Sequence, residues 1–338
     1  MELKEKKRVE YIDLAKGFCI LLVVFTHAKD AFLVNSSLDF AMASFRMPLY
    51  FLLSGLFFKE YGGFSDFLLK KTNKLLIPFI FFYVVIALLS PLFLDRFIPG
   101  FIKNTGWNYI FCVYNENLNG MPMGIWFLWC LFLVNALFYV VILIAKIRPK
   151  SFLLVLISLS LLLGVLGFYL GYNKINLPLY LDSSLTAFPF FCCGYVLRKF
   201  TNLLYPNKYD KYLIIFSLIC FVLVGVCAYD KVSFRKNEFD VSIFSVYICG
   251  ILGALGVLFI SKKIKKIPFV SFMGRYSIMV LCSHQVVLMG VGMLLKRLNC
   301  TGWSAVIISF IITSVISYLL IYPMKKYLPY VTAQKDLI

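Results

Sequence analysis

Apolar runs of close to 20 residues recur along the whole chain, and they constrain its fold more than any other feature. A helix that crosses the hydrocarbon core of a bilayer needs about 20 such residues. The composition agrees, because 61% of the 338 residues are hydrophobic and only 15% are charged, whereas soluble domains average about 25% charged residues. These values exclude a soluble enzyme, a nucleic-acid-binding domain and a disordered protein. We therefore expect an all-α integral membrane protein embedded in a lipid bilayer.

Ten segments are apolar enough to predict about ten transmembrane helices. Backbone groups in lipid must be hydrogen-bonded within the segment, and these runs are too long for the strands of a membrane barrel. The predicted spans are residues 11–28, 39–58, 75–94, 124–145, 152–171, 183–197, 211–229, 241–260, 270–295 and 303–322. No connection, not even residues 95–123, is long enough to fold separately. We therefore interpret residues 1–338 as a single transmembrane domain.

Basic residues are distributed unevenly between alternate loops of these predicted spans. With the N-terminus placed in the cytoplasm, the inner loops and termini carry 22 Lys and Arg residues and the outer loops carry 9. Basic residues collect in the cytoplasmic loops of membrane proteins. This rule explains the net charge of +18 without a nucleic-acid partner. It also predicts that both termini are cytoplasmic.

Ionisable residues inside the predicted spans are the strongest indication of function. A charge at the centre of a membrane helix costs about 2.5–3.5 kcal/mol on insertion scales, so such residues usually face a cavity or a partner. Three basic residues and the two histidines of the chain fall into this class: Lys16, Arg46, Arg275, His27 and His284.

The first span combines an acid, a base and an imidazole on one stripe. Lys16 and His27 are eleven residues apart, which returns to nearly the same helix face about 16 Å further along the axis. Asp13 lies one turn before Lys16 and can pair with its ammonium group. This stripe is suited to a catalytic site. An alternative is that Lys16 and Asp13 snorkel at the interface while His27 caps the outer end.

The second span carries Arg46 about 10 Å from its outer end by helix rise. Pro48 follows two residues later and is expected to open the helix near Ser44. A buried guanidinium beside an opened turn favours a site for an anion or a carbonyl group. An ion pair that only holds the helices together is the alternative.

The ninth span places Arg275 near the cytoplasm and His284 about two and a half turns deeper. His284, with Gln285 beside it, can reach a substrate or bond to a neighbouring helix, and the pattern does not separate the two.

Four segments, in order, resemble the acyltransferase-3 family of integral membrane O-acyltransferases. The first span matches the Arg/Lys-x10-His motif of that family at Lys16 and His27, preceded by Asp13. The second matches its Met-Pro-Leu-Phe-Phe…Ser-Gly segment at residues 47–55. Trp126 begins a segment similar to its Trp-Phe-Leu motif. The fourth is similar to its late Tyr-Ser…His span and ends at His284.

The resemblance extends over nearly the whole chain, and residues 181–195 further resemble the branch of fucose 4-O-acetylase-like proteins. Lys16 stands where many members have Arg, and Tyr50 where Phe is usual. The chain also lacks the Arg-x-x-Arg sequence of some polysaccharide acetylases, so the acceptor class stays open.

The resemblance implies transfer of an acyl group, usually acetyl from cytoplasmic acetyl-CoA, to a hydroxyl group of a sugar on or near the outer face. The acceptor would be a polysaccharide, a lipid-linked sugar or another cell-surface glycan. It also implies a multi-pass protein of a bacterial plasma membrane. Acetyl-CoA is then a co-substrate, and we expect no permanently bound cofactor and no metal.

Residue roles follow from this implied reaction. His27 is the candidate general base, because histidine accepts a proton near neutral pH, and Arg46 is the candidate partner of the oxyanion. Lys16 and Arg275 would hold the phosphates or pantetheine arm of coenzyme A, with Asp13 fixing Lys16. Three further residues are expected to line the site: Ser54, Trp126 and His284. Direct attack on the thioester and an acetyl-imidazole intermediate both fit this pattern.

A transporter or flippase of lipid-linked sugars or small anions is the alternative function, because such proteins also contain intramembrane charges and broken helices. No inverted repeat is evident, however, and the chain is short for the common flippase folds. Transfer of label from acetyl-CoA to a saccharide would distinguish the two.

Overall fold

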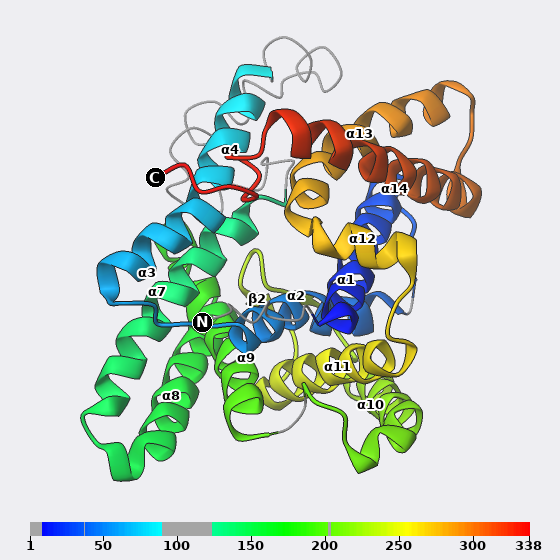
Figure 1. Ribbon diagram of the computed structural model, residues 1–338. Coiled ribbons are helices and arrows are strands. Elements are labelled where there is room, and N and C mark those ends of the chain that lie inside the picture. The colour runs from blue at the N-terminus through cyan, green and yellow to red at the C-terminus, as the bar shows by residue number, and fades with distance from the viewer. Residues whose placement is uncertain (1–8, 37, 90–123, 202–203) are drawn as a thin grey trace.

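The structure is a computed structural model that describes residues 9–36, 38–89, 124–201 and 204–338. The predicted loop 95–123 lies outside these residues. Helices make up nearly all of the described chain (Figure 1), which confirms the all-α prediction. The helices are α1 (Glu10–Ala31), α2 (Leu38–Leu56), α3 (Phe64–Lys71), α4 (Ile77–Leu89), α7 (Trp126–Lys146), α8 (Phe152–Tyr172), α9 (Leu181–Phe200), α10 (Leu213–Cys227), α11 (Ile243–Ile264), α12 (Pro268–Arg275), α13 (Ser277–Arg297) and α14 (Gly302–Tyr327).

Seven helices of the described chain are long and apolar enough to cross a membrane, namely α1, α7, α8, α10, α11, α13 and α14. The protein is therefore a multi-pass membrane protein. Most of the apolar residues of α8 and α10 face outward rather than into the bundle, as expected of helices that contact lipid. A π-helical turn (Thr72–Leu76) joins α3 to α4.

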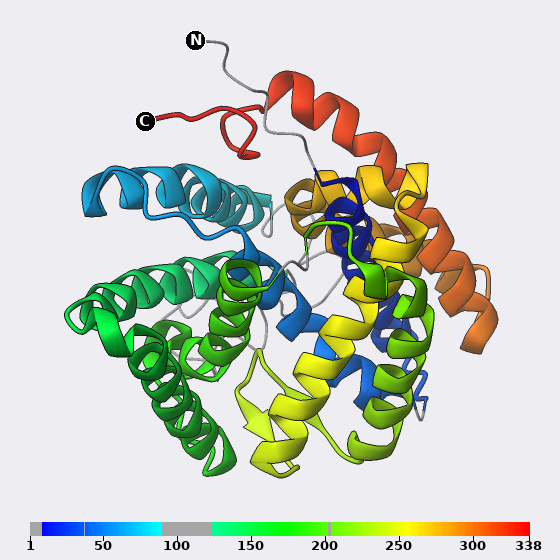
Figure 2. The same ribbon diagram turned by 60° about the horizontal axis from the view of Figure 1, so that its bottom comes forward.

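Helix α2 runs through the middle of the bundle (Figure 2), where it packs against α9 on one side and α11 on the other. Glycine makes the approach to α9 possible. A Cβ atom on Gly55 would lie 2.0 Å from the carbonyl oxygen of Phe191, and one on Gly194 would lie 2.0 Å from that of Leu52. Small residues let membrane helices approach at backbone distance, so these two glycines hold α2 against α9.

The predicted ninth span is two helices rather than one. The chain leaves helical geometry at Tyr276 (φ −113°, ψ 31°), which separates α12 from α13. A Cβ atom on Gly274 would lie 1.9 Å from the carbonyl oxygen of Asp13. This contact presses α12 against the beginning of α1, so the chain must turn before α13 follows the rest of α1. A sequence pattern that records only hydropathy misses such a turn.

Two other elements also differ from the prediction. The sixth span, expected as residues 183–197, is the longer helix α9. The connection between α10 and α11, for which the sequence analysis predicts no element, contains an antiparallel hairpin of β1 (Val232–Ser233) and β2 (Glu238–Phe239).

Several segments predicted on the cytoplasmic side contact one another. Lys266 lies 3.0 Å from Glu10 at the beginning of α1, and Lys70 of α3 lies 2.5 Å from Asp336 near the C-terminus. Hydrogen bonds from Lys70 and Lys74 hold the pKa of Asp336 below its usual value. These contacts join segments that the charge pattern assigns to the same side of the membrane. Which side that is stays a prediction.

Candidate active site

A polar cavity of about 120 Å³ lies near the end of α1 that carries His27. Its charged and aromatic lining includes His27 from α1, Arg46 and Tyr50 from α2, Trp126 from α7 and Arg235 from the hairpin. Three of these, His27, Arg46 and Trp126, are residues that the sequence predicts for the site. The fold therefore brings together candidates that are up to 99 positions apart in the chain.

His27 is held from two sides. Its Nδ1 lies 3.8 Å from a carboxylate oxygen of Asp30, one turn later on α1. The side-chain amide nitrogen of Gln285, on α13, lies 3.1 Å from Nε2. With a proton on Nδ1 toward Asp30, the lone pair on Nε2 accepts the hydrogen bond from Gln285. The imidazole is thus oriented as a base needs to be, and its side chain is still 28% exposed.

His284 lies behind His27, and the lining of the polar cavity does not include it. The two ring centroids are 5.4 Å apart. His284 is fully buried, and its Nδ1 donates to the carbonyl oxygen of Val280 at 2.9 Å. This bond sets the tautomer of His284 and gives the ring of His27 a fixed surface to pack against.

Arg46 projects from α2 into the same cavity. Its Nε and Nη1 are buried, and neither has a hydrogen-bond partner among the residues that the structure describes. The helix runs unbroken from Leu38 to Leu56 across Pro48, so the predicted opening near Ser44 is wrong. A hydroxyl hydrogen bond from Ser44 to the carbonyl oxygen of Ala41, at 2.7 Å, stabilises this turn.

The β-hairpin closes one side of the cavity and brings Arg235 into its lining. Asn237, fully buried, anchors the hairpin. Its side-chain oxygen accepts a hydrogen bond from the Thr186 hydroxyl at 2.8 Å, and its amide donates to the carbonyl oxygen of Gly167 at 3.1 Å. The aromatic rings of Phe234 and Phe239 are also buried. The hairpin is therefore a fixed wall of the site.

Lys16 lies toward the other end of α1, outside the polar cavity. Its Nζ is 5.8 Å from the centroid of Phe57, which directly follows α2, and the guanidinium carbon of Arg198 is 5.5 Å from that same ring. Tyr50 connects the two regions, because it lines the cavity while its hydroxyl reaches the carbonyl oxygen of Lys16 at 3.4 Å. Lys16 and a second cation, Arg198, thus both lie at the ring of Phe57.

Lys71 is a further basic residue in this region. Its Nζ is 5.9 Å from the centroid of Phe58, the neighbour of Phe57. Burial, with a smaller contribution from the charge of Lys59, lowers the pKa of Lys71 to about 8. An anion bound beside this ammonium group would stabilise its charged form.

The remaining predicted residues lie apart from the polar cavity. Asp13 is buried at the contact between α1 and α12. Arg275 is exposed at the end of α12, 5.5 Å from the ring of Tyr276, which it shares with Lys325. Ser54 is partly buried on α2, eight residues beyond Arg46.

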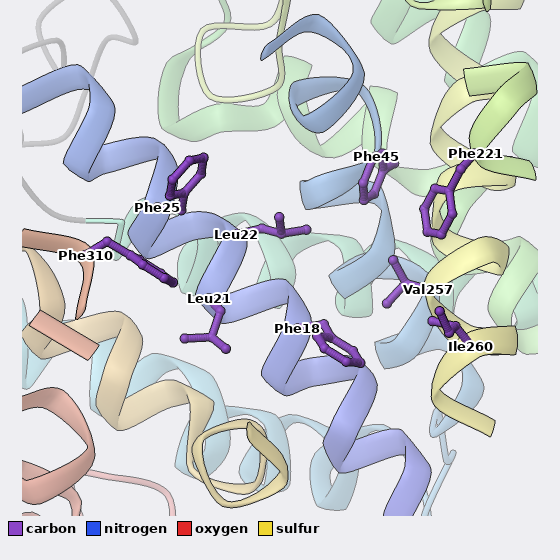
Figure 3. A pocket seen from close by; sticks show the side chains of 9 residues that line it. All are labelled: Phe18, Leu21, Leu22, Phe25, Phe45, Phe221, Val257, Ile260 and Phe310. Carbon is purple, nitrogen blue, oxygen red and sulfur yellow. The ribbon is translucent and has the colours of Figure 1, made fainter. Parts of the chain in front are cut away.

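A larger apolar cavity of about 480 Å³ lies on another face of α1 (Figure 3). Side chains from α1, α2, α10, α11 and α14 line it, and all of them are hydrocarbon: Phe18, Leu21, Leu22, Phe25, Phe45, Phe221, Val257, Ile260 and Phe310. This cavity holds no group that can exchange a proton or stabilise a charge. The polar cavity is the candidate active site.

A family model described as an acyltransferase domain matches residues 9–322 of the chain. The chain belongs to the acyltransferase-3 family. The match includes every residue that lines the polar cavity. No curated protein and no solved structure matches the chain. The protein is thus a membrane acyltransferase, which requires an acyl donor and an acceptor.

The sequence of this acyltransferase contains a signal for one of the residues that the prediction missed. Asp30 follows His27 by three positions, which places the two side chains on one helix face. Arg235 has no such signal, because nothing in its local sequence shows that its loop folds back into the bundle. Arg198 and Lys71 were counted only as basic loop residues.

Proposed function

We propose that this acyltransferase transfers acetyl from acetyl-CoA to a hydroxyl group of a cell-surface sugar, with His27 as the general base. The observation that carries the proposal is the position of His27. It lines a cavity beside the buried guanidinium of Arg46, and Asp30 and Gln285 orient its ring. A base and a fixed positive charge at one cavity are the two groups that acyl transfer to a hydroxyl requires.

In the direct route, the sugar hydroxyl takes the place of the Gln285 amide at Nε2 of His27, which accepts the hydroxyl proton as the sugar oxygen attacks the thioester carbonyl carbon. Arg46 stabilises the negative charge that develops on the carbonyl oxygen. The carbon–sulfur bond then breaks, and the thiolate of coenzyme A takes up the proton that His27 received. In the alternative route, Nε2 itself attacks and forms an acetyl-imidazole. Acetyl bound to protein after an acid quench without acceptor would identify that second route.

The donor is proposed to approach from the region of Lys16. Coenzyme A is a polyanion, and both Lys16 and Arg198 face the ring of Phe57. Tyr50 links this region to the His27 cavity. The pantetheine arm is proposed to pass beside Tyr50, between α1 and α2. Arg275, exposed beside Lys325, is retained only as a secondary contact for the phosphates.

The donor assignment can be tested by kinetics. Lys16→Gln and Arg198→Gln are each expected to raise the KM for acetyl-CoA about tenfold, because a hydrogen bond to a charged group is lost. Lys263→Gln is the matched control, since Lys263 is exposed at a separate lysine-rich cavity beside the beginning of α1. If only the control variant raises this KM, the donor binds at that other cavity.

We propose that His27 lies near the outer face of a bacterial plasma membrane and that the acceptor approaches from that face; the family resemblance and the charge pattern support this proposal. The rings of Trp126 and Phe127 line the cavity and offer flat apolar surfaces against which a sugar ring can pack. The acyltransferase would in that case modify the polysaccharides or other glycans of the cell envelope.

The decisive experiment uses the purified full chain in lipid nanodiscs with radiolabelled acetyl-CoA and an extract of surface glycan. His27→Ala is expected to reduce transfer about 10²–10⁴-fold, the usual contribution of a general base. Ser54→Ala serves as the control for correct folding, because Ser54 lies in the same bundle but outside the lining of the polar cavity. Transfer by a folded His27→Ala protein at the wild-type rate would refute the assignment. Uptake of glycan without acetyl transfer would instead support a transporter.

A further inference from the structure

The polar cavity contains more positive charge than acetyl transfer to a neutral sugar requires. Arg46 from α2 and Arg235 from the hairpin both line it, together with His27. The oxyanion that forms during the reaction carries a single negative charge and needs one guanidinium. No carboxylate is among the residues that line the cavity in the described chain. Asp30, outside this lining, faces Nδ1 of His27 at 3.8 Å.

The buried part of Arg46 lacks a partner. Both Nε and Nη1 are inaccessible to solvent and make no hydrogen bond to any described residue. A buried, unsatisfied guanidinium is costly. Such a group is retained where a ligand supplies the missing acceptor. The planar fork of an arginine matches the paired oxygens of a carboxylate or a phosphate.

The position of Arg235 is built into the fold. Asn237, two residues further along the hairpin, is fully buried and bonded to both Thr186 and the backbone of Gly167. The flanking ring of Phe234 is buried as well. Anchors on both sides hold Arg235 at the cavity wall before any substrate binds. Preorganised charge of this kind serves recognition at little entropic cost.

We propose that Arg235, acting with Arg46, binds an anionic group of the acceptor and so makes this acyltransferase selective for a negatively charged sugar substrate. The group is a carboxylate on the sugar ring or a phosphate that links the sugar to its carrier lipid. This proposal rests on the proposed acetyl transfer and adds the class of acceptor. Arg235 binds the acceptor, and Arg46 contacts both the acceptor and the oxyanion.

Two matched pairs of acceptors test the proposal and separate the two sources of charge. Methyl glucuronide and its uronamide have the same hydroxyl groups and differ only in that a charged carboxylate is replaced by a neutral carboxamide. Farnesyl phosphoglucose and farnesyl glucoside differ only in the phosphate. In each pair we would measure kcat/KM for acetyl transfer by the full chain in nanodiscs. The charged member of one pair is expected to be preferred about tenfold or more, as for hydrogen bonds to charged groups.

The Arg235→Gln variant is expected to abolish this preference, because it raises the KM for the charged acceptor much more than the KM for the neutral one. Arg235→Lys should recover part of the preference, because it keeps the charge but not the fork. Lys236→Gln is the matched control, since it removes the same charge from the next residue of the hairpin, which is outside the cavity lining. If Arg235→Gln and Lys236→Gln reduce the preference for the charged acceptor equally, the preference comes from the overall positive charge of the hairpin, and the proposal is wrong.

Binding provides a readout that does not depend on catalysis. Trp126 lines the same cavity, so quenching of its fluorescence reports occupancy, with Trp126→Phe as the blank. Binding of a charged probe that Arg235→Gln weakens, without any acetyl transfer, would support the anion site while refuting the proposed function. If the wild-type protein uses or binds the charged and the neutral acceptor of each pair equally well, the anion site is refuted. The proposed acetyl transfer would not be affected by that result.

Discussion

The apolar cavity and the polar cavity, two of the cavities beside α1, differ in size and in chemistry, and the smaller one contains the reactive groups. The apolar cavity is the larger, at about 480 Å³, and hydrocarbon side chains line it throughout. The polar cavity measures about 120 Å³, yet it contains His27, Arg46 and Arg235. Both use residues of the first span, on different faces of one helix. Chemistry in this protein thus depends on which face of α1 a cavity touches.

The comparison shows why a small cavity can be the active site. Electrostatic stabilisation is strongest where water is excluded and donors are fixed in place, and both conditions favour a tight space. Hydrocarbon walls in a membrane are ordinary, because lipid chains can fill the space between helices. The apolar cavity needs no catalytic explanation.

The largest expected effect comes from removing the charge of the polar cavity. Arg46→Gln is expected to lower kcat about 10²–10³-fold, the usual cost of removing one group that stabilises an oxyanion. Arg46→Lys should lose less, because an ammonium group keeps the charge. Single-turnover rates with saturating acetyl-CoA provide the measurement. A kcat within twofold of wild type in Arg46→Gln would remove the polar cavity from the reaction.

Filling each cavity in turn tests the comparison directly. Ala43 lines the polar cavity and Val257 the apolar one. Ala43→Phe is expected to lower kcat/KM for a soluble sugar about 10–100-fold, because overpacking a filled site costs about 1–3 kcal/mol. Val257→Phe has room for the added ring and should leave that kcat/KM unchanged. The opposite outcome, with only Val257→Phe inactive, would mean that the apolar cavity binds the sugar.

The beginning of α1 is packed closely against α12. A Cβ atom on Gly274 would lie 1.9 Å from the carbonyl oxygen of Asp13, whereas nothing described lies within 4 Å of one on Gly290. Gly274→Ala should therefore destabilise the protein by about 1–3 kcal/mol, with Gly290→Ala as the neutral control. Thermal unfolding in detergent would measure both. Equal melting temperatures would show that α1 does not need this contact.

The smallest expected effect belongs to Asp30. Its carboxylate lies 3.8 Å from His27 and is 69% exposed. A pair so exposed contributes about 1 kcal/mol or less, so Asp30→Asn should lower kcat about fivefold at most. The pH–rate profile is the measurement that a purely structural role would not move. A loss as large as that of His27→Ala would mean that Asp30 takes part in the proton transfer itself.

Helix periodicity predicted which residues of one segment share a face, but it did not predict which residues of other segments lie beside them. Lys16 and His27 were placed on one stripe by helix periodicity, and both do face α2 or the residue that follows it. Gln285 was considered as a bond to a neighbouring helix, and its amide indeed contacts His27. The break at Tyr276 and the unbroken turn before Pro48 were both missed. Each depends on packing that local propensity does not record.

The sequence by itself determined that the chain is a multi-pass helical membrane protein with rare charges in its spans. These properties follow from hydropathy and a period of 3.6 residues, which are local. Only the tertiary structure decided which of those charges share a cavity. Arg235 reaches His27 because buried Asn237 ties the hairpin to α8 and α9. Contacts between segments so distant in the chain leave no trace in the residues around any one of them.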